Sequence, residues 1–154
     1  MGERAVAEAL EQIPYTLEMG IVIEHKTNGE VEMTLPDSTG NQNMVGIVHA
    51  GALYTFGETV AGIAAGFDLL DKAFPLARKA QIRYLQPARG AIRGSARVAA
   101  SDSQRVLDEL TRDGRSELCV AVSLSDAKGE IVAELDVDYA FRAFRASKST
   151  NPRE

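Results

Sequence analysis

The chain has 154 residues, of which 45% are hydrophobic and 25% charged, as in an ordinary soluble globular domain. Its formal net charge of −5 argues against general nucleic-acid binding. The single cysteine, Cys119, excludes an intramolecular disulfide and fits a reducing compartment, and no Cys/His spacing typical of a metal site is present. Since we recognise neither a signal peptide nor a transmembrane run of about 18 apolar residues, we expect a cytoplasmic protein without a membrane segment.

The first part of the chain predicts a short helix and a hairpin. Residues 3–12 have the spacing of an amphipathic helix. Residues 15–36 predict two strands around a turn at Asn28-Gly29, a dipeptide typical of tight hairpins. The apolar positions that alternate in the second of these strands are Val31, Met33 and Leu35.

A long central helix is expected next. After a turn-rich loop, the length of the apolar segment favours a helix from about His49 to Leu70. Each glycine inside a helix costs roughly 1 kcal/mol relative to alanine. Gly57, Gly62 and Gly66 therefore need a structural reason, and we expect close approach of another backbone, with a curved sheet wrapped around the helix.

The second half predicts three more strands and a final strand. The strands cover residues 79–85, 91–99, 117–125 and 131–141, and residues 103–114 between them fit a short helix that ends at a glycine. The apolar positions that we expect to face the core are Ala80, Ile82, Tyr84, Ile92, Gly94, Ala96, Val98, Leu118, Val120, Val122, Leu124, Ile131, Ala133, Leu135, Val137, Tyr139 and Phe141.

These elements predict an α+β protein in which a long helix covers one face of an antiparallel sheet. Each strand alternates between apolar and polar residues, so the sheet should be covered on one side only. We expect one domain over residues 1–145, with a disordered tail at 146–154, where the composition is polar.

The central segment carries the most informative motif. It is nearly all small and apolar, yet it carries an acid, Glu58, in its middle. The pattern N-x-x-G-x-x-H-x-G occurs at Asn43, Gly46, His49 and Gly51, and Glu58 follows seven residues later. This arrangement resembles the acyl-CoA thioesterases with the hot-dog fold, in particular the phenylacetate-pathway (PaaI-type) branch. The segments ARKAQIRYLQPARG and GEIVAELDVDYAFR resemble later strands of that family, and the likeness covers roughly residues 15–143.

The resemblance implies a fold, an activity and roles for particular residues. The fold is a hot-dog fold, an antiparallel sheet wrapped around a long central helix with short accessory helices. The catalytic stretch His49-Ala50-Gly51 starts the helix, and the backbone N–H of Ala50 polarises the thioester carbonyl. Glu58 acts as general base or nucleophile, and Asn43 helps to hold the water or the acid. No cofactor is implied, since coenzyme A is part of the substrate.

Two departures from the family pattern stand out. Ala50 occupies a position that is usually glycine, which keeps the N–H but adds a methyl group beside the thioester. A serine or threonine that often assists the acid is missing, because the corresponding positions hold Gly62 and Ala77.

Simple geometry indicates that the site is shared between two chains. The N-terminus of a helix offers unpaired N–H groups and a partial positive charge for a developing oxyanion. Glu58 lies eight residues further along, about 12 Å at 1.5 Å per residue, too far for both groups to reach one carbonyl. A second, antiparallel copy of the helix would bring Glu58 of one chain near Ala50 of the other. We therefore expect a homodimer or a dimer of dimers, in which small residues let the two helices approach.

Each assignment has an alternative. Glu58 could be a structural acid paired with an arginine, His49 could cap the helix or fill a dimer contact, and Asn43 could be only a turn former. A hot-dog dehydratase or hydratase, or a non-catalytic acyl-CoA-binding protein, are the competing functions. The spacing of His49 and Glu58 differs from the dehydratase motifs.

The basic residues are concentrated in one region. Residues 76–101 contain no acid and six basic residues, namely Arg78, Lys79, Arg83, Arg89, Arg93 and Arg97. Coenzyme A carries several phosphates, so at least one of Arg78, Lys79, Arg83 and Arg89 is expected to bind it. Alternatively, these side chains pair across strands with Glu134, Asp136 and Asp138.

Overall fold

The computed structural model describes residues 13–144 apart from residues 28, 67, 68, 70 and 71. The described part of the chain forms one antiparallel sheet in the order β1-β2-β4-β5-β6-β3. Its strands are β1 (Val22–Thr27), β2 (Glu30–Leu35), β3 (Ala73–Tyr84), β4 (Ile92–Arg97), β5 (Arg115–Ser125) and β6 (Ile131–Ala143). The helices are α2 (Pro14–Glu18), the 3-10 turn η1 (Thr39–Asn41), α3 (Ala50–Gly66) and α4 (Ala100–Asp113).

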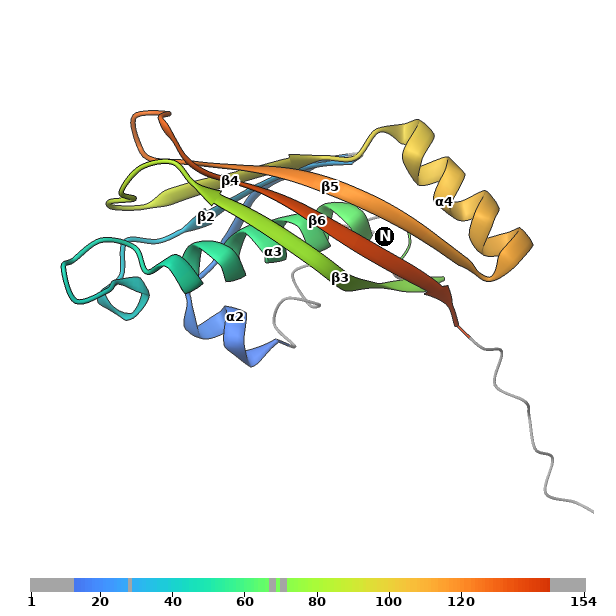
Figure 1. Ribbon diagram of the computed structural model, residues 1–154, viewed down its shortest axis with the longest axis horizontal. Helices are drawn as coiled ribbons and strands as arrows, with labels where there is room; N and C mark the ends of the chain where they lie inside the picture. The colour runs from blue at the N-terminus through green and yellow to red at the C-terminus, as the bar shows by residue number, and fades with distance from the viewer. Residues whose placement is uncertain (1–12, 28, 67–68, 70–71, 145–154) are drawn as a thin grey trace, which may run out of the picture.

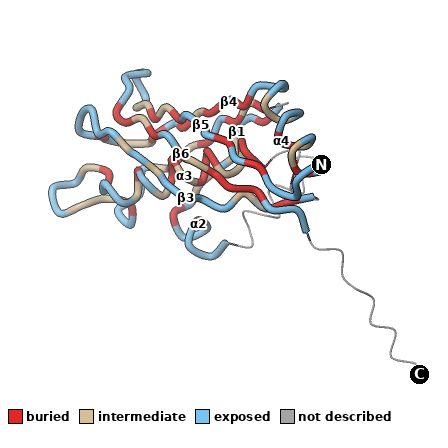
Figure 2. The backbone as a smooth tube through the Cα atoms, turned by 45° about the vertical axis from the view of Figure 1, so that its right-hand side comes forward, coloured by how far each residue is buried: buried red, intermediate tan, exposed pale blue. Residues whose placement is uncertain are grey.

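The long helix α3 lies along one face of the curved sheet, whereas α4 leaves the sheet after β4 and returns into β5 (Figure 1). Buried residues occur along α3 and along the strands of the sheet (Figure 2). The core between helix and sheet contains Val31, Met33, Leu35, Phe56, Val60, Ile92, Val120, Val122, Leu124, Leu135 and Val137. The α+β architecture and most of the predicted inward positions are therefore confirmed.

Glycines permit a close contact between α3 and the sheet. A Cβ atom at Gly57 would lie 2.5 Å from Leu135 Cδ1, and one at Gly94 would lie 2.8 Å from Val60 Cγ2. At Gly62 the nearest atom is the Tyr139 hydroxyl oxygen, 3.2 Å from such a Cβ. The expectation of a second backbone was thus wrong at Gly57 and Gly62, because side chains of β6 occupy the space that these glycines leave.

The predicted hairpin is present, but the segment before it differs. Residues Thr27 and Glu30 pair with each other, and Gly29 has a φ of +77° that favours glycine. Residues 14–18 form the helix α2 rather than the start of a strand. Pro14 occupies its first turn, where a missing N–H and a fixed φ suit a helix.

Other predicted boundaries of helices and strands also differ from the observed ones. Helix α3 ends at Gly66, and the N–H of Leu69 bonds to the Gly66 carbonyl in the turn that follows, so the helix does not reach Leu70 as expected. Strand β3 begins six residues before position 79, because its early part pairs with the end of β6. The helix predicted for residues 3–12 and the tail at 146–154 lie outside the described residues.

Two predicted core positions are exposed. Tyr84 is 49% exposed and Ile131 is 36% exposed. Tyr84 contacts Ala50, the first residue of α3, so it lies where cover by the helix begins. Ile131 is the first residue of β6. Alternation of apolar residues predicted the face of the sheet correctly, but it gave no information on where the helix stops covering it.

Candidate active site

Glu58 lies in the middle of α3 and contacts a tyrosine from the last strand. The Tyr139 hydroxyl donates to Glu58 Oε1 at 2.9 Å and also lies 3.0 Å from the backbone carbonyl of Glu58. Tyr139 is only 2% exposed, and Glu58 is half-buried. Burial, followed by the negative charge and hydrogen bond of Glu58, raises the pKa of Tyr139 far above its ordinary value. Tyr139 therefore remains a neutral donor to the carboxylate.

The Glu58–Tyr139 contact depends on Gly62, one helical turn after the acid. A Cβ atom at Gly62 would lie 3.2 Å from Tyr139 Oη and 4.0 Å from Glu58 Oε1. Sequence reasoning counted Tyr139 only as a core residue. The available signal was chemical, because the hydroxyl of a tyrosine at an inward strand position usually finds a hydrogen-bond partner.

Asn43 shapes the loop that leads into α3. Its side-chain Oδ1 accepts hydrogen bonds from the N–H groups of Val45 at 3.0 Å and Ile47 at 3.3 Å. Its own backbone N–H donates to the Ile47 carbonyl at 2.8 Å. Within the described residues no hydrogen bond joins Asn43 to Glu58. In a single chain, Asn43 thus acts as a turn former, which is the alternative role predicted for it.

His49 precedes the first residue of α3 and occupies one of the free amides there. Its Nδ1 accepts a hydrogen bond from the N–H of Gly51 at 2.9 Å, and its backbone N–H donates to the Asn41 carbonyl at 2.8 Å. The alternative role of His49 as a helix cap is therefore what the structure shows.

The Ala50 amide differs from that of Gly51. Ala50 is exposed, and the described residues provide no acceptor for its N–H. Its carbonyl accepts a hydrogen bond from the Tyr84 hydroxyl at 2.9 Å, which ties the start of α3 to β3. An N–H without an acceptor at a helix start can bind an oxyanion.

A groove opens beside this helix start. It has a volume of about 390 Å³ and lies between the end of α2, η1 and the first turn of α3. Its lining comprises Tyr15, Glu18, Met19, Gly40, Asn41, Gln42, His49, Gly51 and Ala52. The buried side chain of Asn41 donates to the Met19 carbonyl at 2.9 Å and so joins η1 to the end of α2.

One chain does not bring Glu58 and the Ala50 amide together. The two residues lie on the same helix, eight positions apart, which corresponds to about 12 Å along its axis. Large apolar side chains are exposed in the preceding loop and in the first turns of α3, with Met44 99% exposed and Val45 and Tyr54 also accessible. Strand β3, at the edge of the sheet, exposes Leu76.

The basic residues of the predicted patch divide into those that form an ion pair and those for which the described residues provide none. Arg83 forms an ion pair with Glu134 across β3 and β6, which is the cross-strand alternative. Arg97 pairs with Glu30 at 3.0 Å. Arg78, Lys79 and Arg89 are exposed, and the described part of the chain gives them no ion pair. These three remain candidates for contacts with an anionic ligand.

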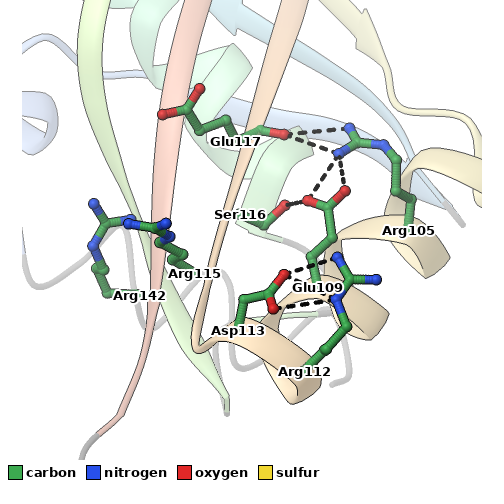
Figure 3. Close-up of a pocket in the computed structure, with 8 residues that line it drawn as sticks. All are labelled: Arg105, Glu109, Arg112, Asp113, Arg115, Ser116, Glu117 and Arg142. Atoms are coloured by element: carbon green, nitrogen blue, oxygen red, sulfur yellow. Dashed lines mark hydrogen bonds and ion pairs between the residues drawn. The ribbon is translucent and has the colours of Figure 1, made fainter.

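A second pocket, of about 460 Å³, lies between α4 and strands β5 and β6 (Figure 3). Most of its charges pair with one another. Arg105 contacts Glu109 at 3.2 Å, Arg112 contacts Asp113 at 2.8 Å, and the Ser116 hydroxyl donates to Glu109 at 2.5 Å. The hydrogen bond from Ser116, together with Arg105, lowers the pKa of Glu109. This pocket was not predicted.

Two further properties of the described residues concern metals and membranes. They contain no group of three or more His, Cys, Asp or Glu side chains placed to hold a metal ion. Among them, no helix has the length and apolar character that crossing a membrane requires.

A long helix wrapped by an antiparallel sheet defines the hot-dog fold. The chain belongs to the DUF4442 family, described as a domain of unknown function, whose model matches residues 2–140. No curated protein matches it. A solved Pseudomonas aeruginosa protein of unknown function, described as a probable thioesterase, is 29% identical, with a TM-score of 0.82 over 93% of this chain and 97% of that chain.

Two solved thioesterases share the fold at lower identity. A variant of a Staphylococcus aureus thioesterase is 17% identical, with a TM-score of 0.70 over 84% of this chain and 99% of that chain. A variant of a P. aeruginosa thioesterase is 13% identical, with a TM-score of 0.75 over 94% and 96% of the two chains. The resemblance to hot-dog thioesterases that the sequence motif indicated is therefore confirmed.

Proposed function

We propose that this protein is a thioesterase that hydrolyses the thioester of an acyl- or aryl-CoA. The observation that carries the proposal is the environment of Glu58. Tyr139 fixes one carboxylate oxygen through a hydrogen bond of 2.9 Å, and no cation pairs with Glu58 within the described residues. A carboxylate that is held in place without a neutralising cation can accept a proton or attack a carbonyl. The likeness to solved thioesterases supports the same chemistry.

The reaction needs a nucleophile and an oxyanion donor. As general base, Glu58 removes a proton from water, and the resulting hydroxide attacks the thioester carbonyl. The exposed Ala50 N–H stabilises the oxyanion, the C–S bond breaks, and the coenzyme A thiolate leaves and takes up the proton. As nucleophile, Glu58 instead forms an anhydride with the acyl group, and water then hydrolyses it.

The proposed site is completed by a partner chain. The distance along α3 separates Glu58 from Ala50, so Glu58 of one protomer acts with the Ala50 amide of its partner in a homodimer or a dimer of dimers. The exposed apolar residues Met44, Val45 and Tyr54 near the helix start support this arrangement. Residues contributed by each helix then form two equivalent sites per dimer.

We assign binding of the coenzyme A phosphates to exposed basic residues that have no ion pair within the described part of the chain. Arg78, Lys79 and Arg89 are exposed, whereas Arg83 already pairs with Glu134. Arg78 occupies a β-bulge, since the pairing of β3 with β6 passes from Ala77 to Lys79 without it. Such bulges often redirect a side chain near an active site. Arg78 is therefore the first of these residues to test.

The proposal is tested by measuring coenzyme A release from a panel of short-chain, long-chain and aryl-CoA thioesters. The wild-type protein should release coenzyme A from at least one of them, and Glu58→Gln should lose most of that activity. Glu32→Gln is the matched control, because Glu32 is an exposed acid of β2. Binding of acyl-CoA without release would instead indicate a binding protein, and hydration of an enoyl-CoA would indicate a hydratase.

A further inference from the structure

We infer that Tyr139 is a positioning residue for Glu58, holding one carboxylate oxygen so that the other is directed at the water or the thioester. This inference rests on the proposed function, because it assigns to Tyr139 a role in the work of Glu58. Tyr139 lies on β6 and is 81 residues from Glu58 in the sequence, so the contact exists only in the folded protein.

The position of the Tyr139 hydroxyl is fixed by two acceptors. It lies 2.9 Å from Glu58 Oε1 and 3.0 Å from the carbonyl oxygen of the same residue. The carbonyl belongs to the backbone of α3, and the single hydroxyl proton is shared between this carbonyl and Oε1. The hydroxyl in turn restricts the rotamers of Glu58 to those that keep Oε1 beside it.

The helix leaves space for this hydroxyl at Gly62. A Cβ atom there would lie 3.2 Å from Tyr139 Oη, closer than most Cβ contacts. A glycine in the interior of a helix is unfavourable by roughly 1 kcal/mol relative to alanine. The contact with Tyr139 supplies a reason for this glycine, because alanine would press on the oxygen that holds the acid.

The chemistry of the donor suits a carboxylate that acts as general base or nucleophile. A hydrogen bond to a carboxylate favours its charged form, as an ion pair does. A neutral phenol does this without a positive charge that would neutralise the carboxylate of Glu58. Burial of Tyr139 keeps its hydroxyl protonated, so it continues to donate throughout the working pH range.

The first test is the steady-state kinetics of Tyr139→Phe, which removes only the hydroxyl. We expect kcat to fall about 10-fold with KM nearly unchanged, in line with the loss of one hydrogen bond to a charged group. Wild-type kcat would overturn the inference, and so would a rise in KM with kcat unchanged.

The second test is a rescue at Gly62. A serine Cβ at this position would lie about 4 Å from Glu58 Oε1, so its hydroxyl is within reach of the carboxylate. In the Tyr139→Phe background, Gly62→Ser should restore part of the lost kcat, whereas Gly62→Ala adds the same Cβ without a donor and should not. Equal effects of serine and alanine would show that the donor is irrelevant. If Tyr139→Phe does not fold, Gly62→Ala in the wild-type background displaces the hydroxyl instead and should lower kcat.

Glu58→Gln separates this inference from the proposed function. A fully active Glu58→Gln variant would remove both, because Glu58 would then have no role for Tyr139 to support. An inactive Glu58→Gln variant together with wild-type kinetics for Tyr139→Phe would remove only the positioning role.

Discussion

Glu58 and Glu109 show how the partners of an acid separate a reactive site from a stabilising one. Glu58 receives a hydrogen bond from the neutral Tyr139 hydroxyl, and no cation pairs with it in the described part of the chain. Glu109 receives a hydrogen bond from Ser116 and an ion pair from Arg105. These partners lower the pKa of Glu109 and occupy both of its carboxylate oxygens.

The two acids also differ in whether their carboxylate oxygens already have partners within the protein. Glu109 has its charge satisfied by Ser116 and Arg105 within the cluster of α4 and β5 (Figure 3). Glu58 has one oxygen held by Tyr139 and is half-buried on the central helix. A pocket rich in charged groups is therefore a weaker candidate for catalysis here than a single acid with a neutral donor.

The largest expected effect is on turnover, and it should differ between alanine variants of the two acids. Glu58→Ala should lower turnover by about 10² or more, as for loss of a positioned base or nucleophile. Glu109→Ala should leave turnover unchanged, because its partners Ser116 and Arg105 belong to the charged cluster of α4 and β5 and not to the proposed site. Coenzyme A release at saturating substrate measures both. Comparable losses of turnover in the two variants would contradict the assignment of Glu58 as the reactive acid and Glu109 as a stabilising one.

The next effect tests whether Glu58 acts across a dimer. Asn43 shapes the loop before Ala50, so Asn43→Ala should damage the part of the site that carries the amide. In a mixed dimer of Glu58→Ala and Asn43→Ala chains, one site carries both defects and the other carries neither. Refolding an equal mixture should therefore regain roughly a quarter of wild-type activity, since about half of the dimers are mixed and each has one intact site.

The control for this experiment is each variant refolded alone, and both must be severely impaired. Mass spectrometry should confirm that mixed dimers form. Mixed dimers that are no more active than the separate variants would place Asn43 and Glu58 in one chain, or would show that they do not act together.

A smaller effect concerns the stability provided by Glu58. In Glu58→Ala the Tyr139 hydroxyl keeps the backbone carbonyl of residue 58 as an acceptor at 3.0 Å. No buried donor is left unsatisfied, so the free energy of unfolding should change by less than about 1 kcal/mol. Urea unfolding followed by circular dichroism measures it. A loss of several kcal/mol would indicate that Glu58 is a structural acid.

The smallest effect is the pH dependence of stability at Glu109. Its pKa in the folded protein is below the ordinary value of 4.5, so its contribution is present above that pH. The contribution is lost as the pH falls through the lower folded value, where the folded protein also takes up the proton. The difference in Tm between wild type and Glu109→Gln should therefore be visible at pH 7 and should close at strongly acidic pH. A constant difference across this range would contradict the assignment.

The sequence was informative wherever the structure depends on neighbours along the chain. Alternation located the faces of β2, β4, β5 and most of β6, because successive side chains of a strand point to opposite sides. The Asn28-Gly29 turn and Gly114, which ends α4 with a φ of +68°, follow from glycine's tolerance of left-handed backbone. The helix α2 was missed, because Tyr15 and the residues after it fit a strand as well as a helix.

The sequence by itself placed Glu58 on a buried helix and Asn43, His49 and Ala50 at its start, because spacing along one helix is local information. Only the tertiary structure decided the partners of these residues. It brings the Tyr139 hydroxyl to Glu58, makes His49 Nδ1 the acceptor of the Gly51 amide, and leaves the Ala50 amide without an acceptor among the described residues. A contact across 81 residues depends on the register of β6 and on how closely Gly57 and Gly62 let α3 approach it, and no local pattern determines either.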